Sequence, residues 1–269
     1  MPLAVCATPI GNLEDVTLRA LSELAAADLV LCEDTRRTRV LLDRHGIRAR
    51  VVSYHEHNEA RRVAELLPRL ETGETMVLVS DAGLPGINDP GMRLVAACRG
   101  AGVPVTVVPG PSAVESALVS CGFEFERYQF VGYLPRSGRA LAALWGELAS
   151  WPYAAVAFES PQRLPATLAS LALAMPDRRC AVCRELTKAF EEVVVGPAQE
   201  VADRFRTPPK GEITVVLAPA PATPDTLPEQ EAIEAVGELV AAGLPRRTAA
   251  DLVARLTDQS KNRLYRASL

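Results

Sequence analysis

The chain is poor in sulfur and has no long apolar run. Its six cysteines are too few, over 269 residues, for the disulfide framework of a small secreted domain. The apolar runs end at charged residues or glycine well before the roughly 18 residues that a membrane-spanning helix needs. Residues 1–7 carry no basic segment and lead directly into a strand-like run, so we expect no signal peptide. These absences predict a protein of the reducing cytoplasm that does not act at a membrane.

Common site motifs are also missing. The chain contains neither a GxxxxGK[ST] phosphate-binding loop nor the GxGxxG dinucleotide fingerprint. Its three histidines form no HExxH motif and no facial triad, so we expect no metal ion. Cys180 and Cys183 make one CxxC pair without the second pair that zinc needs, and we expect both in the core. No Ser-His-Asp or Cys-His arrangement stands out, which favours a reaction whose reactivity belongs to a cofactor.

The charge is unevenly distributed over an otherwise ordinary globular composition. Apolar residues make up 48% and charged residues 23%, which excludes a disordered or fibrous protein, and the net charge is -4. Six arginines nevertheless lie within residues 36–50, and a second basic stretch follows residue 244. Two local basic patches on an acidic chain favour a selective polyanion site, and a solvated surface is the alternative.

Short apolar runs alternate with amphipathic segments through the first half of the chain. Strands are expected at residues 3–7, 29–32, 51–54, 76–79 and 103–108, and helices at 15–27, 36–45, 59–70 and 91–100. Asp15 is expected to cap the first helix. Strand–helix alternation with short connections predicts a parallel sheet covered by helices, which is the α/β class.

Each of these predicted strands ends in a polar or glycine-rich segment. The segments are TPIGN (8–12), EDTR (33–36), HEHNE (55–59), SDAG (80–83) and PGPS (109–112). The carboxyl ends of parallel strands share one edge, where such folds bind ligands. Residues 80–91 hold three glycines, which allow the backbone to approach a ligand closely, and Asp81 can accept hydrogen bonds from a ribose or an ammonium group. A long turn without a ligand is the alternative.

The second half of the chain predicts a different sheet. Helices are expected at 112–120, 141–148 and 164–174, and strands at 128–131, 154–158, 181–185, 191–195 and 212–217. The third and fourth of these strands have no helix between them, which predicts a mixed or antiparallel sheet. We predict an N-terminal α/β domain (1–112), a second α/β domain (113–218), a Pro/Ala-rich linker (219–228) and a C-terminal helical segment (229–269) with helices at 229–242 and 246–257.

Nine motifs in a fixed order resemble a known family. They are ATPIGNL (7–13), EDTR (33–36), HEHNE (55–59), SDAGLPGINDPG (80–91), VPGPSA (108–113), GYLPR (132–136), FESP (158–161), RELTK (184–188) and KGE (210–212). Over essentially its whole length, the chain resembles the bacterial small-subunit (16S) ribosomal RNA cytidine-2′-O-methyltransferases of the tetrapyrrole-methylase superfamily. Leu84 and Gln162 depart from the family, which usually has threonine and commonly histidine there, so we give neither position a hydroxyl or imidazole role.

The resemblance implies two α/β domains of tetrapyrrole-methylase type, with S-adenosyl-L-methionine held in a folded shape in the cleft between them. It also implies a homodimer that 2′-O-methylates a cytidine ribose in small-subunit ribosomal RNA, as free RNA or in the assembled subunit. By matching motif positions, the resemblance assigns the cofactor to Pro9, Asp81, Ala82, Gly83, Ile87, Ser112, Ala113, Phe158 and Gly211.

The residues expected to carry the reaction lie on the same polar edge. Glu33, Asp34 and His55 are candidates for a base that assists the 2′-hydroxyl, a contribution of about 10²- to 10⁴-fold. Asn12 and Asn58 are candidates for orienting the ribose through hydrogen bonds.

RNA phosphates are expected to contact Arg36, Arg37 and Arg39. Residues 229–269 are either an RNA-binding helical module or a support for a dimer, and the excess of basic residues after position 244 favours RNA. Two other functions stay open. One is methylation of a tetrapyrrole or another small acceptor by an enzyme of the same superfamily, and the other is RNA binding by a non-catalytic ribosome-assembly factor.

Overall fold

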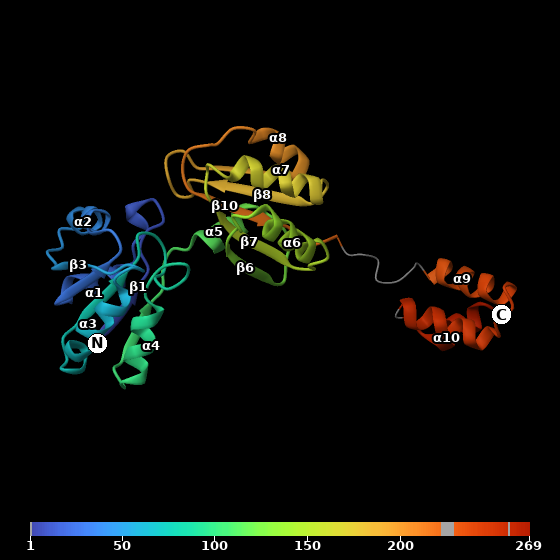
Figure 1. Ribbon diagram of the computed structural model, residues 1–269, viewed down its shortest axis with the longest axis horizontal. Coiled ribbons are helices and arrows are strands. Elements are labelled where there is room, and N and C mark those ends of the chain that lie inside the picture. The colour runs from blue at the N-terminus through green and yellow to red at the C-terminus, as the bar shows by residue number, and fades with distance from the viewer. Residues whose placement is uncertain (1, 222–228, 258) are drawn as a thin grey trace. The chain divides into compact units, whose positions relative to one another are not determined.

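The computed structural model describes residues 2–221, 229–257 and 259–269 (Figure 1). The chain divides into two units, Met1–Pro219 and Ala220–Leu269. Most of the predicted linker, residues 222–228, lies outside the described residues. None of the described helices is long and apolar enough to cross a membrane.

A five-stranded parallel sheet forms the first part of the first unit. Its strands are β1 (Leu3–Cys6), β2 (Leu29–Cys32), β3 (Val51–Ser53), β4 (Met76–Val79) and β5 (Val105–Val108). Their spatial order is β3-β2-β4-β1-β5, and every neighbouring pair is parallel. The predicted parallel sheet is confirmed, and the carboxyl ends of its strands therefore share one edge.

Helices cover both faces of this sheet. They are α1 (Leu18–Ala26), α2 (Thr35–Arg44), α3 (Glu59–Glu71) and α4 (Met92–Gly100), with a 3-10 helix η1 (Leu13–Asp15) before α1. Because alternate strand residues point to opposite faces, Leu3 and Val5 pack with residues of α3 and α4, whereas Ala4 and Cys6 pack with α1 and α2. With both faces covered, β1, β2 and β4 are buried along their whole length, which explains their uninterrupted apolar runs.

The first helix begins later than the sequence predicts. Instead of one helix over 15–27 capped by Asp15, the chain forms η1 and then starts α1 three residues after Asp15. The side chain of Thr17 accepts a hydrogen bond from the Ala20 amide at 3.1 Å and so caps α1. The prediction for Asp15 is wrong because a threonine nearer the first helical turn satisfies its free amide.

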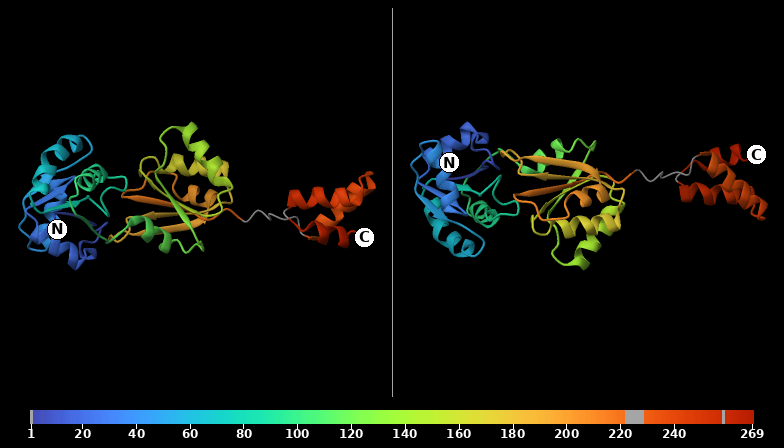
Figure 2. Two further views of the ribbon diagram at one scale, coloured as in Figure 1. Left: turned by 90° about the horizontal axis from the view of Figure 1, so that it is seen from below. Right: turned by 90° about the horizontal axis from the view of Figure 1, so that it is seen from above.

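The second sheet of the first unit is mixed. Its strands are β6 (Tyr128–Tyr133), β7 (Ala154–Glu159), β8 (Arg179–Arg184), β9 (Glu192–Pro197) and β10 (Ile213–Leu217), in the order β6-β7-β10-β8-β9. β6 and β7 are parallel, whereas β10 runs antiparallel to β7 and β8, and β9 antiparallel to β8. The predicted mixed sheet is confirmed. In both views of Figure 2 the two sheets form separate lobes of the first unit, called here the first lobe (β1–β5 with α1–α4) and the second lobe (β6–β10 with α5–α8).

The second lobe is covered unequally on its two faces. One face packs against α6 (Gly138–Ala149), α7 (Leu164–Ala174) and α8 (Ala198–Arg204). The other packs against α5 (Ala113–Ser120) and against Ile10, which comes from the first lobe. The sequence does not predict α8, because seven residues make fewer than two full repeats of a helical pattern.

The described part of the second unit consists of three helices. They are α9 (Glu229–Ala241), α10 (Arg246–Thr257) and α11 (Lys261–Ala267), which pack around small apolar side chains and Leu264. Gly243 lies between α9 and α10 with a φ of +97°, a conformation that glycine adopts without strain. The predicted helical segment is confirmed, and α11 is an addition that the sequence does not predict.

A buried guanidinium joins three segments of the second lobe. Arg178 is 5% exposed and donates hydrogen bonds to the carbonyl oxygens of Ala218 at 2.9 Å, Ala149 at 3.3 Å and Trp151 at 3.4 Å. It therefore holds the chain after β10 to the loop between α6 and β7.

Replacing Arg178 with alanine removes the donor for all three carbonyls. An unsatisfied buried acceptor costs about 1–3 kcal/mol, so we expect Arg178→Ala to lower the free energy of unfolding by about 2 kcal/mol or more. Denaturant unfolding followed by circular dichroism measures the change. Arg206→Ala is the control, since it removes an exposed guanidinium paired with Asp203, and it should cost less than about 1 kcal/mol. Equal losses in the two variants would contradict the structural role of Arg178.

Candidate functional site

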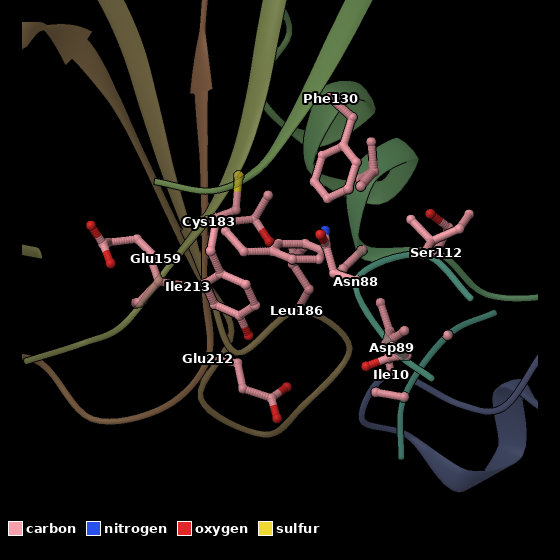
Figure 3. Close-up of a pocket in the computed structure, with 18 of the residues that line it drawn as sticks. Ile10, Asn88, Asp89, Ser112, Phe130, Glu159, Cys183, Leu186, Glu212 and Ile213 are labelled. Atoms are coloured by element: carbon pink, nitrogen blue, oxygen red, sulfur yellow. The ribbon is translucent and has the colours of Figure 1, made fainter. Parts of the chain in front are cut away.

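A cavity of about 670 Å³ lies in the first unit, where the polar strand ends of the first lobe face the second lobe. Its first-lobe walls come from the loops after β1 and β4, and its second-lobe walls from the start of α5 and from β6, β7, β8 and β10. Figure 3 shows Asp89 and Ser112 on one side of this space and Glu212 and Ile213 on the other. The cavity lies at the sheet edge where the sequence predicts a ligand.

The loop over residues 80–91 is closed by its own hydrogen bonds. The Ser80 hydroxyl donates to the carbonyl oxygens of Ala82 at 3.1 Å and Gly83 at 3.0 Å. Gly83 also exchanges two backbone hydrogen bonds with Thr8, at 2.9 and 3.1 Å, which ties the loop to the end of β1. The φ of Gly83 is +76°, which only glycine adopts readily, so this close turn depends on the residue type.

The far end of the same loop is anchored to α3 by Glu59. Its Oε1 accepts hydrogen bonds from the Tyr54 hydroxyl and from the Gly91 amide, both at 3.0 Å. Burial raises the pKa of Tyr54, so its hydroxyl stays protonated and donates. A Cβ on Gly91 would lie 2.9 Å from Cδ2 of Leu78, so the chain can pass this point only as glycine. Glu59 therefore supports the loop from outside the cavity.

His55 and Asn58 use their polar groups on the turn before α3. The Asn58 side chain accepts from the His55 amide at 2.9 Å and donates to the Ser53 carbonyl oxygen at 3.2 Å. Its Nδ2 also lies 3.1 Å from Nε2 of His55. Neither residue is among those that line the cavity, and their predicted contacts with a substrate stay predictions.

The two acidic candidates after β2 differ in their surroundings. Asp34 caps α2 and binds the Arg36 guanidinium through both carboxylate oxygens, at 3.1 and 2.7 Å. These hydrogen bonds lower the pKa of Asp34 to about 2, which makes it a poor proton acceptor near neutral pH. Desolvation and then the charge of Asp81 raise the pKa of Glu33, so Glu33 is the more basic of the pair.

The charged residues that line the cavity are predominantly acidic. They are Asp81, Asp89, Glu115, Glu159 and Glu212, with Arg37 as the one basic member in the described part of the chain. A concave surface with one sign of charge raises the local concentration of ligands of the opposite sign. The charge of the lining therefore suits a cationic ligand.

Two of the second-lobe carboxylates have partners within their own lobe. Glu159 is 2% exposed, accepts the Thr167 hydroxyl hydrogen bond at 2.6 Å and pairs with Arg163 at 2.5 Å. Glu115 accepts hydrogen bonds from the Tyr128 hydroxyl at 2.8 Å and from the hydroxyl of the serine that precedes α5. The hydrogen-bonding groups of both carboxylates are therefore already engaged by residues of the second lobe.

The two first-lobe carboxylates that line the cavity differ in their hydrogen bonds and ion pairs. Asp81 accepts the Asp34 amide hydrogen bond at 3.0 Å and lies 3.7 Å from the Arg37 guanidinium. Asp89 has no hydrogen bond and no ion pair with any described residue. Burial, followed by the charges of Glu33 and Asp81, raises the pKa of Asp89 to about 6.

On the second-lobe side, the cavity is lined by Gly211, where there is no room for a side chain. A Cβ on Gly211 would overlap the side chain of Glu185. That side chain is fixed by Lys188, whose Nζ lies 2.8 Å from Glu185 and 3.0 Å from Glu212. Gly211 has a φ of +101°, so both the space and the backbone exclude another residue type.

The loop after β1 packs against the β8–β9 loop at a similar glycine. A Cβ on Gly11 would lie 2.5 Å from Cγ of Lys188. The Asn12 amide donates to the Thr187 hydroxyl at 3.0 Å, and the Asn12 side chain accepts from the Glu14 amide at 3.1 Å. Asn12 is thus part of the contact between the lobes and is not among the residues that line the cavity.

Three aromatic rings form one wall of the cavity. The Phe158 ring lies 4.9 Å from the Phe130 ring and 5.6 Å from the Tyr133 ring, both edge to face. Tyr133 is 61% exposed, so its ring stands at the open side of the cavity. Such a wall suits a planar heterocycle.

Most of the positions assigned to the cofactor lie around the cavity. Eight line it, namely Asp81, Ala82, Gly83, Ile87, Ser112, Ala113, Phe158 and Gly211, whereas Pro9 does not. Among the expected RNA contacts, Arg37 lines the cavity, and Arg36 and Arg39 are exposed on α2 outside it. Within the described ranges, no group of three or more His, Cys, Asp and Glu side chains is arranged to hold a metal ion.

Sequence reasoning misses three residues that the structure brings to the site. Asp89 and Tyr133 line the cavity, and Glu59 anchors its loop. Asp89 lies within the glycine-rich segment 80–91 and Tyr133 within the GYLPR motif. The motifs include both residues but assign no role to either. Nothing in the sequence pairs Glu59 with Gly91, which lies 32 residues away.

Comparisons with known proteins agree with this arrangement. Residues 2–202 match the tetrapyrrole (corrin/porphyrin) methylases, and residues 228–269 match the RsmI C-terminal HTH domain. Ribosomal RNA small subunit methyltransferase I of Mesorhizobium japonicum is 44% identical over 99% of this chain and 91% of its own length. The protein of the same name from Mycobacterium tuberculosis is 46% identical over 94% of this chain and 88% of its own.

Solved structures share the fold at lower identity. Uroporphyrin-III C-methyl transferase from Thermus thermophilus, complexed with S-adenyl homocysteine, is 19% identical, with a TM-score of 0.58 over 81% of this chain and 97% of its own. A diphthine synthase is 17% identical, with a TM-score of 0.61 over 85% of this chain and 92% of its own. Because the family match and the closely aligned relatives extend over most of the sequence, this chain belongs to the tetrapyrrole methylase family and, within it, to the ribosomal RNA small subunit methyltransferase I proteins.

Proposed function

We propose that the protein transfers a methyl group from S-adenosyl-L-methionine to the ribose 2′-oxygen of a cytidine in small-subunit (16S) ribosomal RNA. The observation that carries the proposal is a cavity that joins an excess of carboxylates to an aromatic wall at the strand ends of a methylase fold. The names of the aligned relatives support ribosomal RNA as the acceptor. Action in the cytoplasm as a homodimer is part of the same proposal.

The lining of the cavity fits the chemistry of S-adenosyl-L-methionine. The ligand carries a sulfonium and an ammonium group, which suit the carboxylate of Asp81. Its adenine ring suits an apolar and aromatic surface such as that of Phe158 and Ile213. We propose binding contacts at the eight cavity-lining positions named above and at Pro9, which precedes the lining residue Ile10.

The chain contributes mainly alignment. When bound, S-adenosyl-L-methionine supplies an electrophilic methyl group. Displacement at that carbon requires the acceptor oxygen to approach in line, so holding both groups in one geometry accounts for much of the rate. The hydrogen bonds of Ser80, Thr8 and Glu59 fix the loop 80–91 and so fix the binding surface before the ligands arrive.

The acceptor is proposed to dock on the first-lobe side of the cavity. The exposed arginines at positions 36 and 39 are the proposed phosphate contacts. Asn12, Asn58, Glu33, Asp34 and His55 remain the proposed groups near the ribose, and Asp34 is the weaker proton acceptor of the two acidic residues because Arg36 occupies it.

Methyl transfer from radiolabelled S-adenosyl-L-methionine tests the proposed function directly. Purified small ribosomal subunits, free small-subunit RNA and a porphyrinoid should be compared as acceptors. We expect label in RNA at one ribose, identified by resistance of the adjacent phosphodiester to alkali. Label in the porphyrinoid alone would reject the RNA proposal. Failure to bind S-adenosyl-L-methionine in calorimetry would favour a non-catalytic assembly factor.

The Glu59 anchor predicts a change in cofactor binding without any contact to the cofactor. Glu59→Ala removes the acceptor for the Gly91 amide and the Tyr54 hydroxyl, which frees one end of the loop 80–91. We expect the affinity for S-adenosyl-L-methionine to fall about tenfold, equivalent to about 1.4 kcal/mol. Calorimetry measures it, and Glu65→Ala is the control, because Glu65 lies on the same helix and pairs with Arg62 instead. Unchanged affinity in Glu59→Ala would contradict the anchor.

The basic surface of α2 predicts a change in the salt dependence of RNA binding. If Arg39 contacts a phosphate, Arg39→Ala should weaken RNA binding and reduce the slope of log affinity against log salt by about 0.7 to 1. Binding of small-subunit RNA at several salt concentrations gives the slope. Arg206→Ala removes the same charge from an exposed position at the end of α8 and should leave the slope unchanged. A common slope for wild type and Arg39→Ala would reject the phosphate contact.

A further inference from the structure

The carboxylates of the cavity differ in whether they already form hydrogen bonds or ion pairs within the protein. Glu115, Glu159 and Glu212 each accept hydrogen bonds from side chains of the second lobe. Asp81 accepts an amide hydrogen bond and faces the Arg37 guanidinium. Asp89 is the cavity-lining carboxylate without a hydrogen bond or ion pair in the part of the chain that the structure describes. A partly buried carboxylate without a partner costs stability, which makes Asp89 a candidate for a role in chemistry.

The backbone on both sides of Asp89 is fixed. Asn88 adopts a φ of +60°, and its side chain lies against Gly132 of β6, where a Cβ would come within 3.0 Å of the Asn88 Oδ1. On the other side, Pro90 is followed by Gly91, whose amide is bound by Glu59. Asp89 therefore projects from a restrained segment into the cavity, as Figure 3 shows.

The charged and titratable groups around Asp89 come from three segments. Glu33 follows β2, Asp81 follows β4, and the Tyr133 hydroxyl comes from β6 of the second lobe. Two neighbouring negative charges favour the protonated form of Asp89 and thereby increase its affinity for a proton. A proton acceptor of this kind is more effective near neutral pH than an ordinary surface aspartate.

We propose that Asp89 is the general base that accepts the proton of the ribose 2′-hydroxyl, and that Glu33 acts on it through its charge as a positioning residue. The proposal rests on the proposed function and assigns the base within it. As the 2′-oxygen forms its bond to the methyl carbon, the carbon–sulfur bond breaks and its electron pair stays on sulfur. The 2′-hydroxyl proton passes to the Asp89 carboxylate and later to water. The step needs no further reactant.

Asp89→Asn keeps the size of the side chain and removes the proton acceptor. In single-turnover transfer to small subunits with saturating S-adenosyl-L-methionine, we expect the rate to fall about 100-fold. Calorimetry should give a dissociation constant for S-adenosyl-L-methionine close to that of the wild type. Asp203→Asn, at an exposed aspartate paired with Arg206, is the matched control and should leave both values unchanged. A full rate in Asp89→Asn, or a rate that recovers at higher cofactor concentration with weakened binding, would overturn the proposal.

The pH dependence of the single-turnover rate distinguishes Asp89 from Glu33 as the general base. The base must be ionised, so the wild-type single-turnover rate should fall as the pH drops through about 6, the pKa of Asp89. Glu33→Gln removes a negative charge near Asp89 and should move the midpoint of this fall to lower pH. The fall of the rate at low pH, called here the base-dependent limb, should remain. Asp89→Asn should abolish the limb. The reverse result, with the limb lost in Glu33→Gln and kept in Asp89→Asn, would assign the base to Glu33 and overturn the proposal.

A measurement on the free protein provides a readout that does not involve activity. With aspartate labelled at the side-chain carboxyl carbon, NMR should show one resonance that titrates near pH 6 in the wild type and is missing in Asp89→Asn. The absence of such a resonance would overturn the proposal even if the variant were slow. If the wild type labelled no RNA, the proposed function would fail. An active wild type with an equally active Asp89→Asn would reject only the base.

Discussion

Parallel pairing of β1 with β4 and β5 is the constraint on which the cavity depends. In this register Cys6 is level with both Val79 and Val108, so the chain leaves three adjacent strands at the same height. The loops that follow must share one space, and the backbone bridge between Thr8 and Gly83 is a direct consequence. Antiparallel pairing would send alternate loops to opposite edges of the sheet, and residues far apart in sequence would not converge.

Hydrogen bonds and ion pairs divide the carboxylates of the site into two groups. One group holds the site together, and the other is free to react. Glu59 and Glu159 are engaged by donors on fixed elements, which satisfies the buried charge and locks a loop or a strand end. Asp34 is engaged by Arg36 at the start of α2. The hydrogen bonds from Arg36 lower the pKa of Asp34. Burial, followed by the charges of Glu33 and Asp81, raises the pKa of Asp89 instead.

The sequence predicts the architecture because the fold follows from local patterns. Apolar runs give the strands, and the polar ends of those runs give the edge at which the cavity lies. The pattern fails where the outcome depends on contacts distant in sequence. The HEHNE segment carries the polar groups expected of a substrate site, but its pattern does not reveal that Glu59 binds Gly91, 32 residues away. The sequence does not predict the short helices α8 and α11 for a different reason, because seven residues are too few to show a helical periodicity.

The distribution of charge also bears on which part of an RNA would enter the cavity. The charged groups of the interior are mainly carboxylates, whereas Arg36 and Arg39 are exposed on α2, and the α2 residue Arg37 lines the cavity at 3.7 Å from Asp81. Phosphates are attracted to the arginines and repelled by the carboxylates of the interior. A ribose hydroxyl is neutral and can accept a hydrogen bond or donate one to a carboxylate. The same arrangement that suits a cationic methyl donor would therefore admit the sugar and hold the phosphates at the rim.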